Sequence, residues 1–185
     1  AQLYNNTGKV VVCQFGDGAV EEGVFFETLN FASLKKLPLL LVCEDNELAI
    51  HSTREERKGF HSFADLVKTF DFQYGEGDGS SATEVVGKTR DILARMKTSG
   101  RPGFLHFNYF RFLEHVGPLE DFDKGYRAKP KDVVDQWDPV PKLHRDCLAG
   151  DPHLMAFAIT EPAGGSDVED GHGALPVGAV DGVRE

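Results

Sequence analysis

Two short, continuous apolar runs, separated by a segment with helical periodicity, constrain the fold of this chain more than any other feature. The first run is KVVVCQF at residues 9–15, and the second is LLLVC at residues 39–43. Continuous rather than alternating apolarity is typical of strands that are buried on both faces, as in a parallel sheet. Parallel neighbours need a crossover connection, so these residues predict a right-handed βαβ unit.

The connecting segment, residues 21–36, is predicted to be a helix. Its apolar positions recur at helical spacing, while its acidic residues lie toward the start and two lysines lie at the end, which complements the helix dipole. Pro38 ends the helix before the second strand. The apolar positions at helical spacing are Phe25, Leu29, Ala32 and Leu37, and we assign Phe25, Phe26, Leu29 and Phe31 to the core or to a subunit interface.

The rest of the chain repeats this alternation more loosely. Residues 62–70 predict a short helix, residues 82–98 an amphipathic helix and residues 103–109 a third strand. A short strand at 72–74 precedes the sequence GEGDGSS, which predicts a glycine-rich turn, and one helix is expected around residues 141–148. The expected fold class is therefore α/β, an open and mostly parallel sheet with helices on both faces.

Composition narrows the classes of function. A net charge of −10 would repel nucleic acid and anionic membranes, so neither is an expected partner. No apolar run approaches the roughly 20 residues needed to span a bilayer, and the first residues lack the layout of a signal peptide. The three cysteines show no paired spacing, and Cys13 and Cys43 lie in strand-like runs. We expect these two to be buried, reduced thiols in a cytoplasmic protein.

Both strands of the βαβ unit end in residues that are suited to binding a ligand. Gly16-Asp17-Gly18 follows the first strand, Asn46 follows the second, and 27 residues separate Gly18 from Asn46. In open α/β sheets, ligands bind outside the carboxyl ends of the strands. Either piece alone is more often a tight turn or a loop, whereas both together at this spacing favour a ligand site.

The segment from Gly16 to Asn46 resembles the thiamine-diphosphate motif, which opens with GDG and closes with an asparagine after a helix and a strand. The sequences EGVFFETLNFA, KLP and EDNELAIHST resemble the alpha subunits of pyruvate, branched-chain 2-oxo-acid and acetoin dehydrogenases. This resemblance covers roughly residues 9–127. It implies a thiamine-diphosphate-binding fold, of which this chain carries a part.

Three parts are expected along the chain. Residues 1–127 form the α/β domain that the resemblance identifies as thiamine-diphosphate-binding. Residues 128–160 form a helical or extended appendage, because the apolar pattern thins there. Residues 161–185 are rich in Gly, Asp and Pro without periodicity, which predicts a disordered tail.

The resemblance implies a magnesium site at the two strand ends. Magnesium takes near-octahedral oxygen ligands, few of them carboxylates, and usually binds phosphate and water as well. The implied metal ligands are the carboxylate of Asp17, the side-chain amide oxygen of Asn46 and the backbone carbonyl of Leu48. The two phosphates of the cofactor and a water would complete the shell.

Backbone geometry is expected to help hold the diphosphate. Gly16 and Gly18 would let the chain turn sharply and approach the anion closely, because they carry no Cβ. The helix that begins near Glu21 would point its amino terminus at the same anion. The cofactor-binding residues that the resemblance implies are Gly16, Asp17, Gly18, Ala19, Asn46, Leu48, Ala49 and His115.

A second motif, FRFLEHVGPLEDFDKGYR at residues 110–127, follows the third strand. It resembles the loop in which a histidine of the alpha subunits approaches the diphosphate, and it implies His115 as the catalytic histidine. Many relatives carry YRxHGHS here, where this chain has RFLEHVGP. Arg111 and Arg127 are candidates to neutralise phosphate or a substrate carboxylate. The alternative is that Glu114 and Arg127 are solvated loop charges.

The resemblance implies the alpha subunit, here an amino-terminally truncated fragment, of a thiamine-diphosphate-dependent dehydrogenase. Such enzymes decarboxylate a 2-oxo acid oxidatively, or cleave acetoin, and pass the acyl group to a lipoyl domain. The implied partners are a beta subunit in an α2β2 assembly, a lipoyl-bearing acyltransferase and a small 2-oxo acid or acetoin, and the chain alone is expected to be inactive. The alternative is a non-catalytic relic or interaction module that retains the α/β fold.

Overall fold

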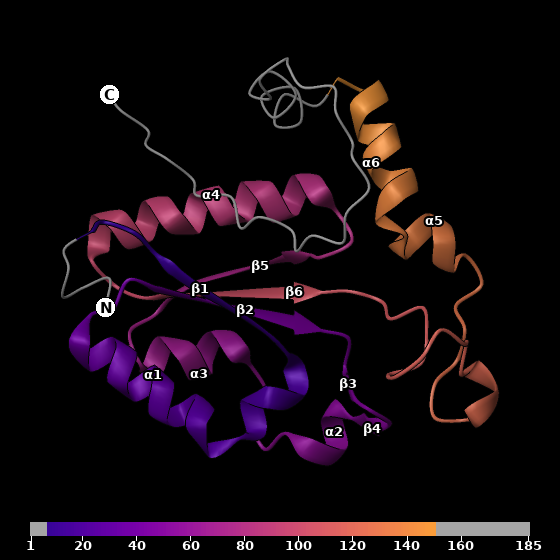
Figure 1. Cartoon of the computed structure of the whole chain (residues 1–185), viewed down its shortest axis with the longest axis horizontal. Helices are drawn as coiled ribbons and strands as arrows, with labels where there is room; N and C mark the ends of the chain where they lie inside the picture. The colour runs from indigo at the N-terminus through magenta and orange to yellow at the C-terminus, as the bar shows by residue number, and fades with distance from the viewer. Residues whose placement is uncertain (1–6, 151–185) are drawn as a thin grey trace, which may run out of the picture.

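The computed structural model describes residues 7–150, which are built around a four-stranded parallel sheet (Figure 1). The spatial order of the strands is β1-β2-β6-β5. β2 lies between β1 and β6, and β5 pairs with the other side of β6. The four strands are β1 (Val11–Gly16), β2 (Leu39–Asp45), β5 (Gln73–Asp78) and β6 (Gly103–Asn108).

Helices cover both faces of this sheet, as expected for the α/β class (Figure 1). On one face, α1 (Gly23–Lys35) and α3 (Phe63–Thr69) pack on a cluster that includes Cys43 of β2 and Phe104 of β6. On the other face, α4 (Ala82–Ser99) packs on residues of β2 and β6. The sequence prediction of an open parallel sheet between helices is therefore confirmed.

β2 fits its prediction because its side chains alternate between the two apolar clusters. Leu40 and Val42 face the α4 side, whereas Leu41 and Cys43 face α1 and α3, and all four are buried. Burial raises the pKa of the Cys43 thiol, and the nearby Asp45 carboxylate raises it further, so this cysteine is an inert thiol of the core.

β1 is not buried on both faces, contrary to the prediction. Val11 is 45% exposed and Val12 is 55% exposed, and Cys13 is exposed rather than a buried thiol. Among the described strands, β1 pairs with β2 alone and therefore lies at an edge. In the apolar cluster between α4 and the sheet, the strand residues belong to β2 and β6. α4 therefore does not cover β1.

α1 begins later than predicted. A 3-10 turn, η1 (Asp17–Glu21), follows β1 directly, and the α-helix starts at Gly23 instead of near Glu21. The predicted inner stripe is present, since Phe25, Leu29 and Ala32 are buried, but Phe26 (38%) and Phe31 (55%) are exposed. The helix ends at Lys35, and the capping residue Lys36 adopts the left-handed conformation common at helix carboxyl ends.

β5 is longer than predicted because most of the glycine-rich sequence is strand rather than turn. The strand runs through Gly75 and Gly77 in register with β6. A Cβ at Gly75 would lie 3.0 Å from Leu105, and one at Gly77 would lie 2.8 Å from the Glu84 carboxylate of α4. These glycines therefore allow close packing against β6 and α4, and they do not mark a turn.

Two helices, not one, follow the sheet in residues 128–150. α5 (Val133–Trp137) and α6 (Pro139–Leu148) meet at Asp138, whose carboxylate accepts a 2.9 Å hydrogen bond from Val140 N. α6 is tied to the sheet domain by Lys142, which pairs with Asp78 of β5 at 2.6 Å. The predicted appendage at 151–160 and the predicted tail at 161–185 lie outside the described residues.

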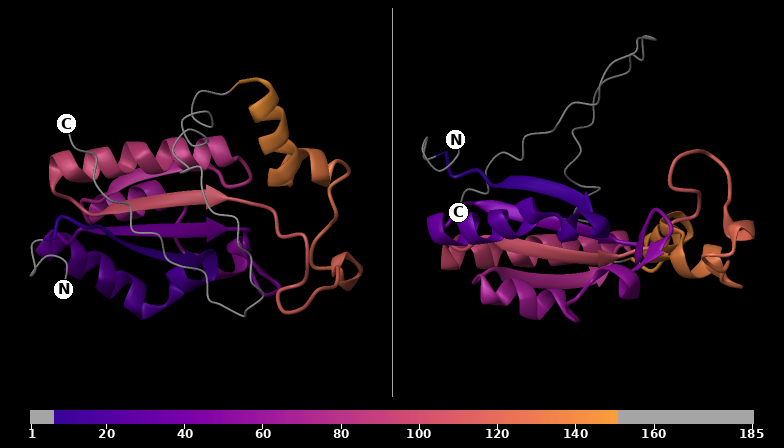
Figure 2. Two further views of the ribbon diagram at one scale, coloured as in Figure 1. Left: turned by 45° about the horizontal axis from the view of Figure 1, so that its top comes forward. Right: turned by 90° about the horizontal axis from the view of Figure 1, so that it is seen from below.

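The loops at the carboxyl ends of the strands gather on one side of the molecule. Figure 2 shows that the connection from β6 to α5 lies beyond the strand tips. The same side carries a short hairpin, β3 (Leu48–Ala49) and β4 (Ser52–Thr53), the one-turn helix α2 (Arg54–Arg57) and the 3-10 turn η2 (Phe122–Lys124). Within residues 7–150, no helix has both the length and the apolar composition to cross a bilayer.

Candidate functional site

Asp17 lies at the carboxyl end of β1 as the first residue of η1, and it is almost completely buried (1% exposed). Its Oδ2 accepts hydrogen bonds from Arg57 Nη2 at 2.8 Å and from Lys58 Nζ at 3.2 Å. The Lys58 side chain is itself 1% exposed. Sequence analysis did not identify these two cations, although the basic residues of REERK lie shortly after the second strand. Burying a carboxylate is costly unless it has such partners.

Asn46 occupies the corresponding position after β2. Its Oδ1 accepts a 3.0 Å hydrogen bond from the backbone N–H of Leu48, and its Nδ2 donates to the Tyr109 hydroxyl at 2.8 Å. Tyr109 follows β6, so this hydrogen bond joins the ends of two neighbouring strands. Burial raises the pKa of Tyr109, although the hydrogen bond from Asn46 opposes that shift. The Asn46 side chain is thus held at the end of the sheet from both sides.

The segment after Asn46 folds back toward Asp17. β3 and β4 form a two-stranded antiparallel hairpin, and Glu47 and Ile50 adopt left-handed backbone angles, with φ of 66° and 56°. For a β-branched residue such as Ile50, this conformation is strained. A capping box between Thr53 and Glu56 then starts α2, which carries Arg57 to Asp17. The hairpin therefore closes one wall of the site.

All eight predicted cofactor-binding residues line one cavity of about 500 Å³. It also receives Ile50, Tyr109, Arg111 and Glu114. A neighbouring cavity of about 710 Å³ shares Asn46, Leu48, Tyr109 and Arg111 with it. The structure thus brings together residues that the sequence separates by almost one hundred positions, and whether they bind the cofactor stays a prediction. The predicted residues in the cavity are Gly16, Asp17, Gly18, Ala19, Asn46, Leu48, Ala49 and His115.

The two glycines of the GDG motif serve different purposes, since Gly18 lies in the 3-10 turn η1 and Gly16 precedes it. Gly16 has extended angles (φ −76°, ψ 159°), and a Cβ there would meet nothing within 4 Å, so the space beside it is open. A Cβ at Gly18 would lie 2.9 Å from the Cβ of Ala49. Gly18 is required because the hairpin packs directly on η1.

The cavity suits a magnesium diphosphate chemically. Asp17, Asn46 and the Leu48 carbonyl offer hard oxygen donors, and Arg57, Lys58 and Arg111 bring positive charge to the same region. Within residues 7–150, no group of three or more His, Cys, Asp or Glu side chains is placed to hold a metal. Mixed oxygen ligands together with phosphate are the usual mode of magnesium binding. The anion would meet η1 rather than the predicted amino terminus of α1.

The charged residues of the β6–α5 loop differ in whether they line the cavity. His115 is exposed and Glu114 half-buried, and both reach the cavity. Arg111 also lines it, and its Nη2 donates to the Tyr126 hydroxyl at 2.7 Å. Arg127 does not line the cavity and is not a solvated charge, since its side chain is 8% exposed.

The buried carboxylate of Asp121 explains the position of Arg127. Arg127 Nε donates to Asp121 Oδ1 at 2.8 Å, and Arg111 donates to Oδ2 at 3.3 Å. Tyr126 also donates to the same carboxylate. Asp121 therefore organises the loop from within, and the guanidinium of Arg127 is committed to it rather than to phosphate. The sequence pattern did not indicate this arrangement, because the partners lie close together in a segment without periodicity.

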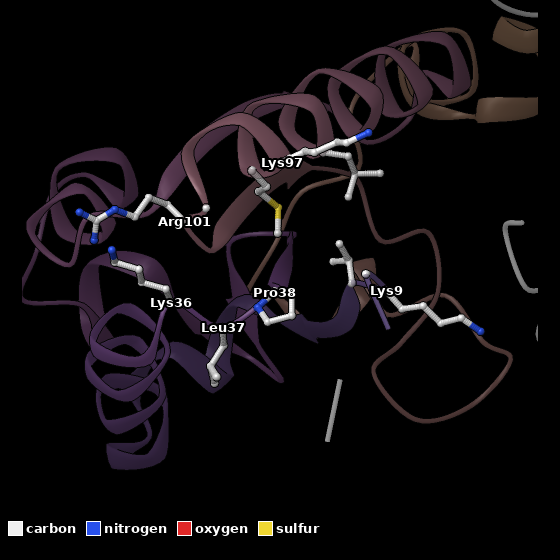
Figure 3. A pocket seen from close by; sticks show the side chains of 11 residues that line it. Lys9, Lys36, Leu37, Pro38, Lys97 and Arg101 are labelled. Carbon is white, nitrogen blue, oxygen red and sulfur yellow. The ribbon is translucent and has the colours of Figure 1, made fainter. Parts of the chain in front are cut away.

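A separate cavity of about 540 Å³ lies at the opposite end of the sheet, beside Lys9 and Pro38 (Figure 3). Its cations include Lys36 and Lys97, which lie at the carboxyl ends of α1 and α4 and complement the helix dipoles there. Arg101, also in its wall, pairs with Asp71 at 2.5 Å. These charges have structural explanations, and no predicted site residue lines this cavity.

The comparisons with known proteins agree on one family. The family model described as dehydrogenase E1 component matches residues 1–150. The chain is 41% identical to the alpha subunit of the mitochondrial pyruvate dehydrogenase E1 component of Dictyostelium discoideum, over 80% of this chain and 39% of that protein. It is 28% identical to the acetoin:2,6-dichlorophenolindophenol oxidoreductase alpha subunit of Cupriavidus necator, over 87% of this chain and 44% of that protein.

A third relative differs in its named substrate. The chain is 26% identical to the mitochondrial 2-oxoisovalerate dehydrogenase alpha subunit of Pan troglodytes, over 78% of this chain and 32% of that protein. The chain thus spans less than half the length of each of these three relatives. The three relatives are all alpha subunits, but their names indicate different substrates.

Proposed function

This chain belongs to the dehydrogenase E1 component family, and from that premise we propose that it is the part of an alpha subunit that binds magnesium and thiamine diphosphate. The proposed reaction of the whole enzyme is oxidative decarboxylation of a 2-oxo acid, or cleavage of acetoin, with acyl transfer to a lipoyl domain. The named substrates of the relatives support this class without selecting one member of it.

One observation carries the proposal. Asp17 and Asn46 come from the ends of two different strands and still line one cavity, together with every other residue that the thiamine-diphosphate motif implies. The pairing of β1 with β2 brings Asp17 and Asn46 together, and the same cavity also takes Ala49 from the hairpin and His115 from the loop after β6. Convergence at the carboxyl ends of parallel strands is the arrangement in which open α/β sheets bind ligands.

The residues of the chain would bind and orient the cofactor. Asp17 would supply an anionic oxygen to magnesium, and Asn46 and the Leu48 carbonyl would supply neutral ones. Gly16, with open space beside it, would allow the diphosphate to approach the backbone. His115, exposed at the cavity, would donate a hydrogen bond to a phosphate oxygen. Bound thiamine diphosphate would supply the carbon nucleophile and the electron sink that decarboxylation requires.

The proposed partners follow from the same family. A beta subunit in an α2β2 assembly would complete the active site, and a lipoyl-bearing acyltransferase would accept the acyl group. The chain by itself would then bind cofactor without turning over substrate. A cytoplasmic location is likewise proposed, from the reduced state expected of its cysteines.

A non-catalytic module is the second candidate, and one observation favours it. The Asp17 carboxylate is already neutralised by Arg57 and Lys58, which is how a purely structural buried carboxylate is satisfied. Such a module would keep the fold and lose the metal site.

Calorimetric titration of thiamine diphosphate into the folded chain, first with magnesium and then with a chelator, separates the two candidates. Binding that requires magnesium supports the cofactor-binding alpha subunit. A folded chain that binds no cofactor under either condition contradicts it and favours the non-catalytic module.

A further inference from the structure

The residue before Asn46 is a buried carboxylate with no place in the cofactor motif. Asp45 ends β2, and its side chain is completely buried (0% exposed). Its Oδ1 accepts a 2.8 Å hydrogen bond from the backbone N–H of Glu47. Its Oδ2 accepts from Arg54 Nη2 at 2.5 Å and from His106 Nε2 at 2.8 Å. One carboxylate therefore joins β2, β6 and α2.

This carboxylate shapes the turn that holds two implied metal ligands. The turn runs from Asp45 to Leu48 and includes Glu47, which is held at a left-handed φ of 66°. Non-glycine residues adopt this conformation at a cost, so the surroundings must enforce it. The Asp45 carboxylate does so from one side by binding Glu47 N–H, and Asn46 does so from the other by binding Leu48 N–H.

His106 and Arg54 in turn fix the Asp45 carboxylate. Arg54 Nη2 and His106 Nε2 both lie within hydrogen-bond distance of Oδ2, and the Glu47 N–H donates to Oδ1, so both carboxylate oxygens are held in place. A buried ion pair of this kind contributes little net stability, and its best-attested use is to specify one conformation.

A second hydrogen bond holds the ring of His106. The Tyr74 hydroxyl lies 3.3 Å from His106 Nδ1 and also contacts the Glu76 carboxylate at 2.7 Å. Phe63 packs against the same imidazole, with ring centroids 4.6 Å apart. The ring therefore has contacts at both nitrogens and on its face, so Nε2 is aimed at Asp45.

We propose that His106 and Arg54 are positioning residues for the turn from Asp45 to Leu48. They act through Asp45 to hold this turn in the conformation that presents Asn46 and the Leu48 carbonyl to magnesium. This proposal rests on the proposed function, because it is the proposed function that makes Asn46 and the Leu48 carbonyl magnesium ligands. Neither positioning residue lines the cofactor cavity, and Arg54 lines only the neighbouring cavity of about 710 Å³.

Two substitutions of His106 separate positioning from simple packing. In His106→Gln, the side-chain amide nitrogen reaches about as far as Nε2 and retains a donor for Asp45. In His106→Asn, the amide reaches about as far as Nδ1 and loses that donor. Arg54→Gln removes the second donor to Asp45, and Arg101→Gln is its matched control at the opposite end of the sheet.

The first measurement is amide hydrogen exchange in the ligand-free full chain. We expect the Glu47 and Leu48 amides to exchange about tenfold faster in His106→Asn and Arg54→Gln, because one hydrogen bond to a charged group is worth about that factor. His106→Gln and Arg101→Gln should match the parent. Uniform acceleration of all amides in both His106 variants, or no change at Glu47 and Leu48 in His106→Asn, would overturn the proposal.

The second measurement is the affinity of the same variants for thiamine diphosphate with magnesium. A loss of about tenfold in His106→Asn, restored in His106→Gln, is expected from the weaker turn. Equal affinity in the parent and His106→Asn would overturn the positioning role while leaving the proposed function intact. No binding by the parent, together with the expected exchange pattern, would remove the cofactor function while the turn-setting role of His106 stands.

Discussion

Asp17 and Asn46 project into the same cavity because the strands that precede them are in matched parallel register. Gly16 of β1 pairs with Glu44 of β2, so the two strands end almost level and each is followed directly by its site residue. A shift of this register would move one residue away from the other along the sheet. The metal site is therefore set first by the pairing of two strands and then by the loops.

The first prediction concerns the charge of Asp17. Asp17→Asn should lower magnesium-dependent affinity for thiamine diphosphate by about 100-fold or more, because Asp17 is the anionic member of the three implied metal ligands. Calorimetric titration would measure this. Asp17→Ala is less informative, since it removes an ion pair from Arg57 and leaves the buried Lys58 without its ion-pair partner, and it should cost about 3–5 kcal/mol of stability. Unchanged affinity in Asp17→Asn would assign Asp17 to the ion pairs alone.

The second prediction separates the hydrogen bond of Asn46 to Tyr109 from its other contributions. Asn46→Ala removes the implied metal ligand, the hydrogen bond to Tyr109 and the acceptor of the Leu48 N–H, whereas Tyr109→Phe removes only the hydrogen bond to Tyr109. We expect at least about tenfold weaker magnesium-dependent binding in Asn46→Ala and a smaller loss in Tyr109→Phe. If both variants lost the same affinity, the contribution of Asn46 would be to hold Tyr109 and not the metal.

The third prediction concerns the glycines on either side of Asp17. Gly18→Ala should destabilise the fold by about 1–3 kcal/mol, because its Cβ would lie 2.9 Å from that of Ala49. Gly16→Ala should leave stability within about 0.5 kcal/mol, because its Cβ meets open space. Urea unfolding would compare them. Combining Gly18→Ala with Ala49→Gly should restore most of the loss, and failure to do so would exclude this contact as its cause.

The fourth prediction concerns pH and the attachment of α6. Burial would raise the pKa of Asp78, but hydrogen bonds from Lys142 and Ser80 lower it below its usual value. A lowered pKa in the folded state gives stability that is present above the unfolded value of about 3.9 and is lost as pH falls through the folded value. Because both side chains are partly exposed, we expect a contribution of only about 0.5–1 kcal/mol.

This pH effect is measured by comparing urea midpoints of the parent and Lys142→Met at about pH 6 and about pH 3. The parent should lose more stability than the variant on acidification. A parallel decline of the two proteins would show that the pair with Lys142 does not set the acid sensitivity of this part of the chain.

The sequence predicted the strands and the positions of the site residues because those features are local. β2 is a continuous apolar run followed by Asn46, and β1 is one followed by Asp17, so the chemistry could be read from each strand and its next residue. The prediction that β1 is buried on both faces was wrong, because burial depends on which elements cover a strand. Val12 has the composition of a core residue and lies at an uncovered edge.

The interactions that the sequence did not reveal are those between residues distant in the chain. Lys58 approaches Asp17 only because the β3–β4 hairpin turns the chain back. His106 approaches Asp45 through the pairing of β2 with β6. The glycines of β5 were read as a turn because periodicity does not distinguish a flexible glycine from one that makes room for Leu105.

The two cations on Asp17 have a further consequence. Arg57 and Lys58 already balance the negative charge of the Asp17 carboxylate before any metal binds. The free energy of metal binding is then the difference between a state in which Asp17 pairs with Arg57 and Lys58 and a state in which it binds the metal. It therefore depends on the new partners of these two cations as much as on the metal ligands. A diphosphate arriving with the metal offers those cations a new anion, so the two ligands are expected to bind more strongly together than either does alone.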